Sequence, residues 1–585
     1  MPDKMHLPAC LPACLPACLP ACLAIFLLVV CSEPAFSQTQ QDPASQAIAQ
    51  QHRAAERDAK SRSENEPISD VRIEFGASQR LPLLPENETP CVVIHSVALQ
   101  RDTDNKFLWL LERLGVDQSA SDLPQGRCLG GKGIQIVADR LQNALISQGY
   151  LTTRIIAEPQ DLKSGLLVLT ILPGRINAIR WKDGSDIRAS LANTVPISRG
   201  DILNLRDVEQ ALENFRRIPT ADADIQIEPA SEPGLSDVLI QRSQSLPLRL
   251  NLTMDDAGAD STGKYQGSAT VSLDNGLGLS DLLYLTHSND LGGGGSGVNG
   301  TAGYIAHYSL PLGYWTLAAT VSRNRYRQTV VGLNQNYLYS GTSEQSEIKL
   351  SRIVHRDMAG KVTASLKAFQ RKSNNFIDDT EVQVQRRVVG GWELGLNYRG
   401  NLATTALDGS LVYRRGTGAF GSIAAPEEAF GEGNSHMQLL IADANLSFPF
   451  ALAGRSWTYS GNWRAQSNFT PLTPQDRFTI GSRYSVRGFD GQSSLSTERG
   501  WLLRNEMLTP IGTGNIGVYL GLDHAELGGA SARALIGTRL SGMVIGLRGA
   551  LNKLQFDVFA GIPVRKPPGF ITDASTAGFN LNLNF

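Results

Sequence analysis

The sequence predicts an all-β transmembrane barrel of about 16 antiparallel strands, preceded by two small α+β domains and an N-terminal helix. In residues 247–585, apolar and polar side chains alternate in successive segments. Residues 91–243 contain one β-α-α-β-β pattern twice. After residue 37, no run of apolar residues approaches the roughly 18 that a membrane-spanning helix needs. A closed barrel is the other structure that pairs all its backbone groups in lipid.

The overall charge argues against nucleic acid as a partner. The chain has 54 basic and 56 acidic residues, whereas a phosphate-binding surface normally carries a basic excess. The 57 glycines and only 7 methionines are typical of a turn-rich β protein.

Residues 1–37 are typical of an export signal peptide. Lys4 supplies positive charge, Leu19–Cys31 forms a short apolar run, and Ala35-Phe36-Ser37 offers small residues for cleavage after residue 37. A lipoprotein signal is disfavoured because Val30 is bulky where that motif needs a small residue. Residues 7–22 repeat Leu-Pro-Ala-Cys four times, which we interpret as an expanded leader or a misassigned start codon.

Cysteine usage supports export. Five of the seven cysteines lie in the leader, and only Cys91 and Cys128 follow it. A single pair of cysteines in an exported chain is most simply a disulfide. A zinc site is the alternative, but two thiols without a clear histidine pair leave it incomplete. We expect neither a metal nor a cofactor.

Two interpretations remain open for residues 38–63, which are rich in Gln, Ala and Arg. The segment favours a helix but has no apolar face. It is therefore either a disordered spacer or a solvated helix that docks into a polar cavity. Residues 64–90 contain four prolines and are expected to form a linker.

The first α+β unit is expected over residues 91–176. The pattern predicts a strand, a short helix, a longer helix and a strand hairpin, with apolar residues of the longer helix at helical spacing. The predicted elements are Cys91–Ile94, Phe107–Leu111, Ile134–Gln148, Thr152–Ala157 and Gly165–Leu172.

The same order recurs over residues 177–243. Asn204 is the expected N-cap of the longer helix, with Asp207 in its first turn. Two consecutive copies indicate an internal duplication, and small open sheets of this kind can take up an extended peptide at an edge. The predicted elements are Ala178–Trp181, Asp186–Asn193, Asn204–Arg217, Asp224–Ile227 and Asp237–Gln241.

Only strands are expected in residues 247–585. Trp392–Tyr398, Ala442–Phe448 and Trp457–Trp463 alternate apolar with polar side chains. This alternation suits lipid outside and a wet lumen inside, with aromatic residues at the interfaces; a soluble all-β fold is the weaker alternative. The last strand alternates apolar residues and ends on Phe585, the usual C-terminal mark of bacterial outer-membrane barrels.

The most distinctive motif is Val486-Arg487-Gly488-Phe489, within Phe478–Gly491 and followed by Glu498–Glu506. Taken alone, an arginine beside a glycine indicates only a turn with a solvated charge. Together with the barrel and the duplicated unit, it makes the chain resemble the TpsB transporters of two-partner secretion, relatives of the BamA insertases. Their Val-Arg-Gly-Phe/Tyr motif is matched without a mismatch.

This resemblance implies the role of several segments. The motif is expected at the tip of a loop folded back into the lumen, where Arg487 pairs with an aspartate in a Phe/Gly-x-Asp-x-Gly strand. Asp523 is the candidate: Gly521 fits that pattern, whereas Ala525 stands where glycine is usual. By the same resemblance, the two α+β units are POTRA domains and residues 38–63 form the plug helix.

The resemblance also implies an outer-membrane pore with periplasmic POTRA domains. Such a pore recognises an unfolded partner exoprotein of haemolysin, adhesin or toxin type and translocates it without ATP. Outer-membrane lipid and the barrel assembly machinery are the other expected partners. A BamA-type assembly factor is the main alternative, and a passive porin is disfavoured by the duplicated domains.

An enzyme is not expected. The chain has no His-Glu-x-x-His and no Gly-x-Ser-x-Gly motif. The Gly130–Gly133 segment is too short for a phosphate-binding loop.

Overall fold

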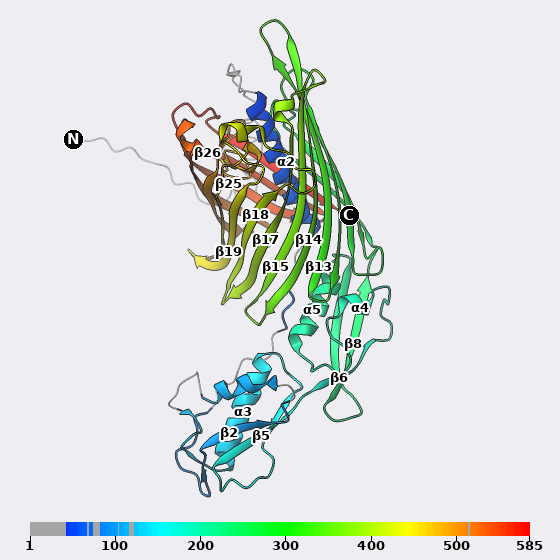
Figure 1. The fold of residues 1–585 in the computed structure, drawn as a ribbon, viewed down its shortest axis with the longest axis vertical. Coiled ribbons are helices and arrows are strands. Elements are labelled where there is room, and N and C mark those ends of the chain that lie inside the picture. Colours follow the sequence, from blue (N-terminus) through cyan, green and yellow to red (C-terminus); the bar gives the residue numbers. More distant parts are fainter. Residues whose placement is uncertain (1–42, 67–68, 74–81, 103–104, 116–121, 513–514) are drawn as a thin grey trace, which may run out of the picture. The chain divides into compact units, whose positions relative to one another are not determined.

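The computed structural model describes residues 43–66, 69–73, 82–102, 105–115, 122–512 and 515–585 (Figure 1). The expected signal peptide and residues 38–42 lie outside the described residues. Ala47–Phe585 form one compact unit, in which a helix, two α+β domains and a barrel follow one another along the chain. Among the helices of the described residues, none has the length and apolar character needed to cross a membrane.

Sixteen antiparallel strands close into a barrel, which confirms the predicted fold class. The two-residue strand β16 (Thr380–Glu381) extends one of the hairpins. The sixteen strands are β9 (Leu248–Asp255), β10 (Gln266–Asp274), β11 (Leu282–Asp290), β12 (Gly300–Leu312), β13 (Trp315–Val331), β14 (Asn336–Arg356), β15 (Gly360–Ile377), β17 (Arg387–Leu402), β18 (Thr405–Thr417), β19 (Gln438–Leu452), β20 (Arg455–Asn468), β23 (Arg499–Pro510), β24 (Ile516–Gly528), β25 (Arg539–Leu551), β26 (Leu554–Arg565) and β27 (Thr576–Asn584).

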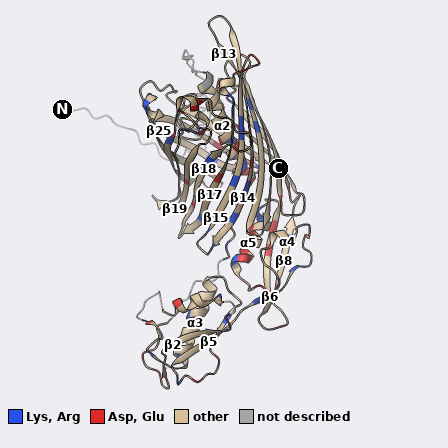
Figure 2. Cartoon of the chain, in the orientation of Figure 1, with Lys and Arg blue, Asp and Glu red and all other residues tan. Residues whose placement is uncertain are grey.

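The alternation along the strands places apolar side chains outside and polar side chains inside the barrel. In β17, Leu394 is 51% exposed, whereas its neighbour Glu393 is only 8% exposed. In the β19–β20 pair, Phe448 lies opposite Tyr459 on one face. Charged residues of both signs lie along β13 to β18 (Figure 2). The barrel therefore presents an apolar surface to lipid and encloses a polar lumen.

The barrel closes where the last strand, β27, pairs with β9. The Phe585 backbone N–H donates to the Leu250 carbonyl oxygen over 2.9 Å, and the Leu250 N–H donates to the Phe585 oxygen over 3.2 Å. Inside the lumen, the Asn251 amide donates to the side chains of Asn582 and Asn584. The terminal residue thus takes part in closing the barrel.

The first α+β domain has a three-stranded sheet in the order β2-β5-β4, with β2 parallel to β5. A strand, β1, does lie within the expected Cys91–Ile94, but it pairs with β3 in a separate small sheet, and β2 is the first strand of the three-stranded sheet. Both segments are short and apolar, and only the long-range pairing with β5 decides which of them joins the three-stranded sheet. The elements are β1 (Val92–Val93), β2 (Ser96–Gln100), η2 (Leu108–Arg113), β3 (Cys128–Leu129), α3 (Gly131–Ser147), β4 (Arg154–Ile156) and β5 (Leu166–Leu172).

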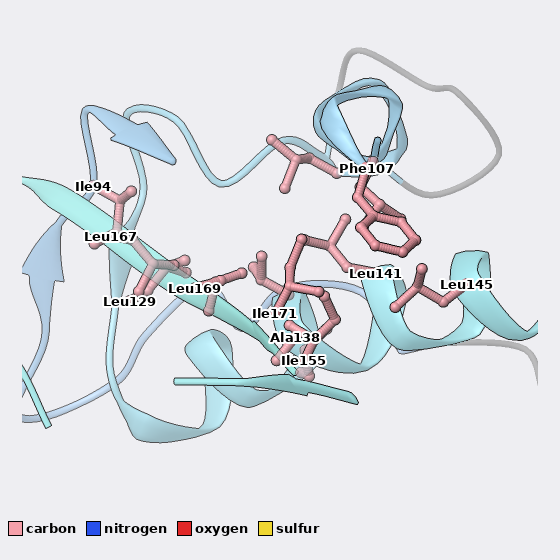
Figure 3. Close-up of a cluster of buried hydrophobic side chains, with 14 of the residues drawn as sticks. Ile94, Phe107, Leu129, Ala138, Leu141, Leu145, Ile155, Leu167, Leu169 and Ile171 are labelled. Carbon is pink, nitrogen blue, oxygen red and sulfur yellow. The ribbon is translucent and has the colours of Figure 1, made fainter. Parts of the chain in front are cut away.

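The core of this domain forms where the apolar face of α3 packs on the sheet (Figure 3). Leu141 and Leu145 of α3 are fully buried, as are Leu167 and Leu169 of β5. Leu84 belongs to the same core, although it lies within the segment expected to be a linker. The domain therefore begins before residue 91.

The second α+β domain repeats this arrangement, with sheet order β6-β8-β7 and β6 parallel to β8. The Asn204 side chain caps the longer helix by accepting a hydrogen bond from the Arg206 N–H over 2.8 Å. The short helix begins at Leu191 and not at the expected Asp186, whose side chain binds those of Arg188 and Arg242. The elements are β6 (Arg175–Trp181), α4 (Leu191–Thr194), α5 (Leu205–Arg216), β7 (Ala221–Pro229) and β8 (Leu235–Gln244).

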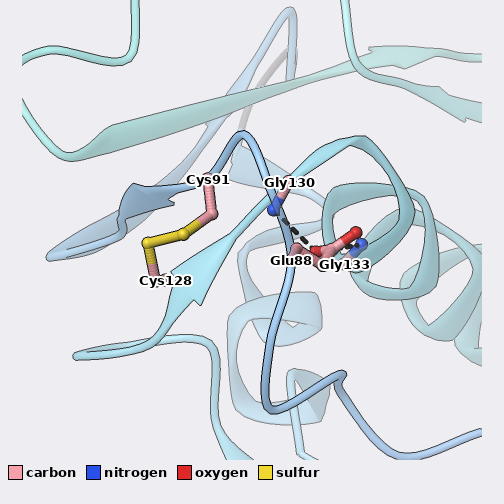
Figure 4. Close-up of a disulfide and its surroundings, with 5 residues drawn as sticks. All are labelled: Glu88, Cys91, Cys128, Gly130 and Gly133. Atoms are coloured by element: carbon pink, nitrogen blue, oxygen red, sulfur yellow. Dashed lines mark hydrogen bonds between the residues drawn. A yellow bond between two sulfur atoms is a disulfide. The ribbon is translucent and has the colours of Figure 1, made fainter.

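A disulfide joins Cys91 to Cys128, just before α3 (Figure 4). On the other side of this segment, the Glu88 carboxylate accepts hydrogen bonds from the backbone N–H groups of Gly130 and Gly133, over 2.6 and 3.0 Å. Negative charge at the first turn also complements the helix dipole. Two contacts therefore hold the chain entering the domain against the start of α3.

We expect alkylation of the non-reduced protein to label neither Cys91 nor Cys128, and alkylation after reduction to label both. Because the bond closes a loop in the unfolded chain, its loss should cost this domain about 2–4 kcal/mol of stability. Mass spectrometry measures the labelling, and faster hydrogen exchange in α3 after reduction measures the loss. Stoichiometric labelling of both thiols without reductant would contradict the prediction.

Candidate functional site

The Val486-Arg487-Gly488-Phe489 motif lies in a long segment that joins β20 to β23. This segment contains a small hairpin of β21 (Phe478–Ile480) and β22 (Leu495–Thr497), and the motif lies between these two strands. The neighbours of the motif lie on the inner wall of the barrel. In β24, for example, Leu520 and Leu522 are exposed on the outside, whereas Asp523 is fully buried. We call residues 481–494 the inner loop.

Arg487 binds two carboxylates of the inner wall. Its Nε donates to Asp523 Oδ2 over 2.8 Å, and its Nη2 donates to Asp523 Oδ1 over 2.9 Å. Its backbone N–H also donates to Asp523 Oδ2 over 2.9 Å. The remaining nitrogen, Nη1, donates to Glu506 Oε2 over 2.6 Å. The forked guanidinium is thus held in one orientation.

A network of charges surrounds this pair. Arg548 Nη1 donates to Glu506 Oε1 over 2.8 Å, and the Arg548 Nε donates to Asp557 Oδ2 over 3.0 Å. Tyr519 donates its hydroxyl proton to Asp557 Oδ1 over 2.8 Å. The guanidinium of Arg548 lies over the Tyr519 ring, 4.7 Å from its centroid. Each carboxylate therefore has at least two donors, which offsets the cost of removing it from water.

Glycines on three neighbouring strands let the inner loop approach the wall. A Cβ at Gly542 of β25 would lie 1.8 Å from the Arg487 carbonyl oxygen. A Cβ at Gly521 of β24 would lie 2.7 Å from Arg487 Nη2, and one at Gly561 of β26 would lie 2.9 Å from the Gly488 Cα. Gly488 itself has a φ of +98°, where a side chain would be strained. A larger residue at any of the three wall positions would prevent the inner loop from lying this close to the wall.

The apolar residues of the motif anchor it beside the charges. Val486 and Phe489 are buried in a cluster that includes Ala525 and Leu540 of the wall. The ring of Phe489 meets Phe570 edge to face, with centroids 5.7 Å apart. The alanine that departs from the family pattern thus contributes a methyl group to this cluster.

Helix α2 (Pro43–Asn65) lies inside the barrel from Ala47 onward (Figure 1). Its side chains contact several strands of the wall and the inner loop. Gln50 donates to Thr262 over 2.7 Å, and Arg57 donates to Gln266 over 3.0 Å. Asp58 accepts from Asn324 over 3.1 Å, and Arg62 pairs with Glu347. The helix is therefore held by polar contacts along its length.

Two further contacts join the helix to the inner loop. The Ser482 hydroxyl donates to both oxygens of Glu56 over 3.3 Å. Arg53 donates to the Gly491 carbonyl oxygen. The two elements in the lumen therefore contact each other at both ends of the loop.

The chain leaving α2 is bound by the second α+β domain and the barrel. Glu66 accepts from Arg217 of that domain over 2.5 Å and lies 3.2 Å from His307 Nε2 of β12. Burial raises the pKa of the Glu66 carboxyl, but His307, Arg217 and Ser309 outweigh this effect and lower it to about 2. The carboxylate is therefore charged at neutral pH and ties the end of α2 to both neighbours.

Comparison with known proteins decides what this arrangement belongs to. Residues 234–549 match the family of haemolysin secretion/activation proteins ShlB/FhaC/HecB. The chain belongs to this family. Residues 175–229 match a POTRA domain and residues 117–174 match the ShlB-type POTRA domain, so the two α+β domains are POTRA 1 and POTRA 2.

Relatives resemble the chain over nearly its whole length. The outer membrane transporter CdiB-2 of Burkholderia pseudomallei (strain 1026b) is 33% identical over 582 residues, covering 96% of this chain and 98% of the relative. The hemolysin transporter protein ShlB of Serratia marcescens is 25% identical, covering 76% and 78%. The structure of CdiB from Acinetobacter baumannii has a TM-score of 0.79 at 29% identity, covering 94% of this chain and 100% of that one. The chain is an outer-membrane transporter of the two-partner secretion type, with its POTRA domains in the periplasm.

The structure brings together the site residues that the sequence singled out and adds others. Arg487 and Asp523 are in direct contact. Glu506 was not predicted as a partner, although it lies in the second motif segment, and Gly542 and Gly561 had no signal in the sequence. No group of three potential metal ligands occurs among the described residues.

Proposed function

We propose that this transporter secretes one unfolded partner exoprotein through its barrel lumen. The observation that carries the proposal is the way α2 lies in the lumen: polar side chains such as Gln50, Arg57 and Asp58 contact a polar wall. Hydrogen bonds of this kind can be exchanged for water or for the backbone of an extended cargo at little net cost. The helix is therefore a plug that can leave without unfolding the barrel.

The POTRA domains are the proposed receptors for the cargo. Within the described residues, the pairings place β5 and β8 at the centres of their sheets and leave β2, β4, β6 and β7 with one edge each. An extended peptide can add to such an edge through backbone hydrogen bonds, which need no fixed sequence. Such binding suits a long, unfolded exoprotein.

Folding of the cargo outside the cell is the proposed driving force, in place of ATP. A folded domain is stable by about 5–15 kcal/mol, so each segment that folds at the surface opposes backward movement. Two relatives are named hemolysin transporters, and a haemolysin-, adhesin- or toxin-like exoprotein is the cargo class proposed here. Outer-membrane lipid and the machinery that inserts this barrel are the other proposed partners.

The test is secretion of the exoprotein whose gene lies beside the gene for this transporter. We expect it at the cell surface or in the medium when the transporter is produced, and in the periplasm when it is absent. Proteoliposomes that contain only this transporter should take up the unfolded exoprotein without nucleotide. Failure of both measurements would refute the proposal.

The same strains distinguish the alternative of a BamA-type assembly factor. Loss of such a factor would deplete many outer-membrane barrels, whereas loss of a dedicated transporter should leave their amounts unchanged. Quantitative proteomics of the outer membrane decides between the two.

A further inference from the structure

The closing seam of the barrel is only partly paired. The ladder between β27 and β9 runs from Asn584 opposite Asn251 to Asn580 opposite Asp255, where β9 ends. On its other side, β27 continues to pair with β26 as far as Thr576. Residues 576–579 therefore have no β9 partner, and backbone groups left in this way must find other partners.

Two side chains supply these partners at Phe579. Asp256 follows directly after β9, and its Oδ1 accepts a hydrogen bond from the Phe579 N–H over 2.8 Å. Arg483 of the inner loop donates from Nη2 to the Phe579 carbonyl oxygen over 2.8 Å. Arg483 also pairs with Asp256 through Nη1. The Asp256 carboxylate and the Arg483 guanidinium, which come from two other segments, thus replace one pair of the missing backbone hydrogen bonds.

The wall is shaped to receive the Arg483 guanidinium. A Cβ at Gly578 would lie 2.6 Å from Arg483 Nη2. On the strand beyond, the guanidinium carbon lies 4.7 Å from the centroid of the Phe559 ring, within the range of a cation–π contact. The lack of a side chain at Gly578 and the ring face of Phe559 together leave a space that fits the Arg483 guanidinium.

We propose that Arg483 is a positioning residue that couples the inner loop to closure of the seam. While the loop lies in the lumen, Arg483 and Asp256 seal the part of β27 that β9 leaves unpaired. When the loop withdraws, this part of the seam loses its partner and loosens. The coupling extends to the plug, because Ser482, next to Arg483, binds Glu56 of α2.

This function differs from that of Arg487. Arg487 holds the loop to Asp523 of β24 and Glu506 of β23, on another part of the wall from β9 and β27. Removing the Arg483 contact should therefore loosen the seam while the loop stays attached at Arg487. A residue needed only for folding would not separate these two effects.

The test is hydrogen–deuterium exchange of the full-length protein in lipid nanodiscs. In Arg483→Gln we expect the amides of residues 577–580 to exchange at least about tenfold faster, equivalent to roughly 1.4 kcal/mol of lost protection. Amides of β24 should keep their wild-type rates. Asp256→Ala should have the same effect, and the double variant should add little to either single change. Arg499→Gln, whose arginine binds Asn468 instead, is the matched control.

Arg483→Lys keeps the proposal testable if the glutamine variant does not fold. One ammonium group cannot reproduce the forked contacts of arginine with both acceptors, so we expect intermediate exchange at residues 577–580. Wild-type exchange there in either Arg483→Gln or Asp256→Ala would overturn the proposal, as would equally fast exchange throughout β24. This readout does not depend on the proposed secretion function. Secretion should also fall in Arg483→Gln and be less impaired in Arg483→Lys. This second measurement rests on the proposed secretion function.

Discussion

Arg487→Ala is expected to lower secretion of the partner exoprotein by at least about tenfold, while the barrel remains folded. The substitution leaves Asp523 buried without its main partner, and breaking a buried pair in this way costs about 3–5 kcal/mol. The inner loop then loses its fixed position on the wall, whereas the strand pairing of the barrel is untouched. Exoprotein in the medium measures secretion, and heat-modifiable migration on gels reports the folded barrel.

An exchange of the two charges tests the contact itself. Arg487→Asp with Asp523→Arg should secrete more than either single variant but less than the wild type. Recovery should be partial because Glu506, which binds Arg487 over 2.6 Å, would then lie near a new aspartate. Arg464→Ala is the control, since Arg464 pairs with Asp443 on the wall but is largely exposed.

Two outcomes would contradict this transport role. Wild-type secretion in Arg487→Ala would show that the motif is an ordinary turn. Loss of heat-modifiable migration would show that Arg487 serves folding, and the fall in secretion would then say nothing about transport.

Deletion of the segment from residue 38 to residue 63 is expected to raise ion conductance in planar bilayers several-fold and leave the barrel folded. Helix α2 contacts the wall mainly through polar side chains, with one small apolar contact of Ala47 with Tyr326 and Tyr339. Its removal therefore exposes a lumen lined mostly with groups that water can solvate. Single-channel recordings measure the change.

Point variants refine this experiment. Arg57→Ala and Arg62→Ala remove contacts with Gln266 and Glu347 of the wall, and together they should increase the frequency of open events. Lys60→Ala is the control, because Lys60 pairs with Glu64 on the same helix. Unchanged conductance in the deletion variant would contradict a plug and favour a spacer.

The sequence predicted the elements of the fold but misplaced some boundaries. The alternation at Trp392–Tyr398 and the helical spacing at Ile134–Gln148 are local patterns, and each survives in the structure. The first strand of POTRA 1 was placed at Cys91–Ile94, whereas Ser96–Gln100 is the strand that pairs with β5. That choice depends on a partner about 70 residues away, which a local pattern does not contain.

The candidate site shows the same division. The sequence by itself determined the barrel, the two repeated domains and Arg487, because strand alternation, helix periodicity and a contiguous motif are written in neighbouring residues. Only the tertiary structure decided that Glu506 shares Arg487 with Asp523, that Gly542 admits the loop, and that Arg483 reaches Phe579. These contacts join segments that barrel closure and strand register bring together, and a one-residue change of register would turn each side chain to the other face.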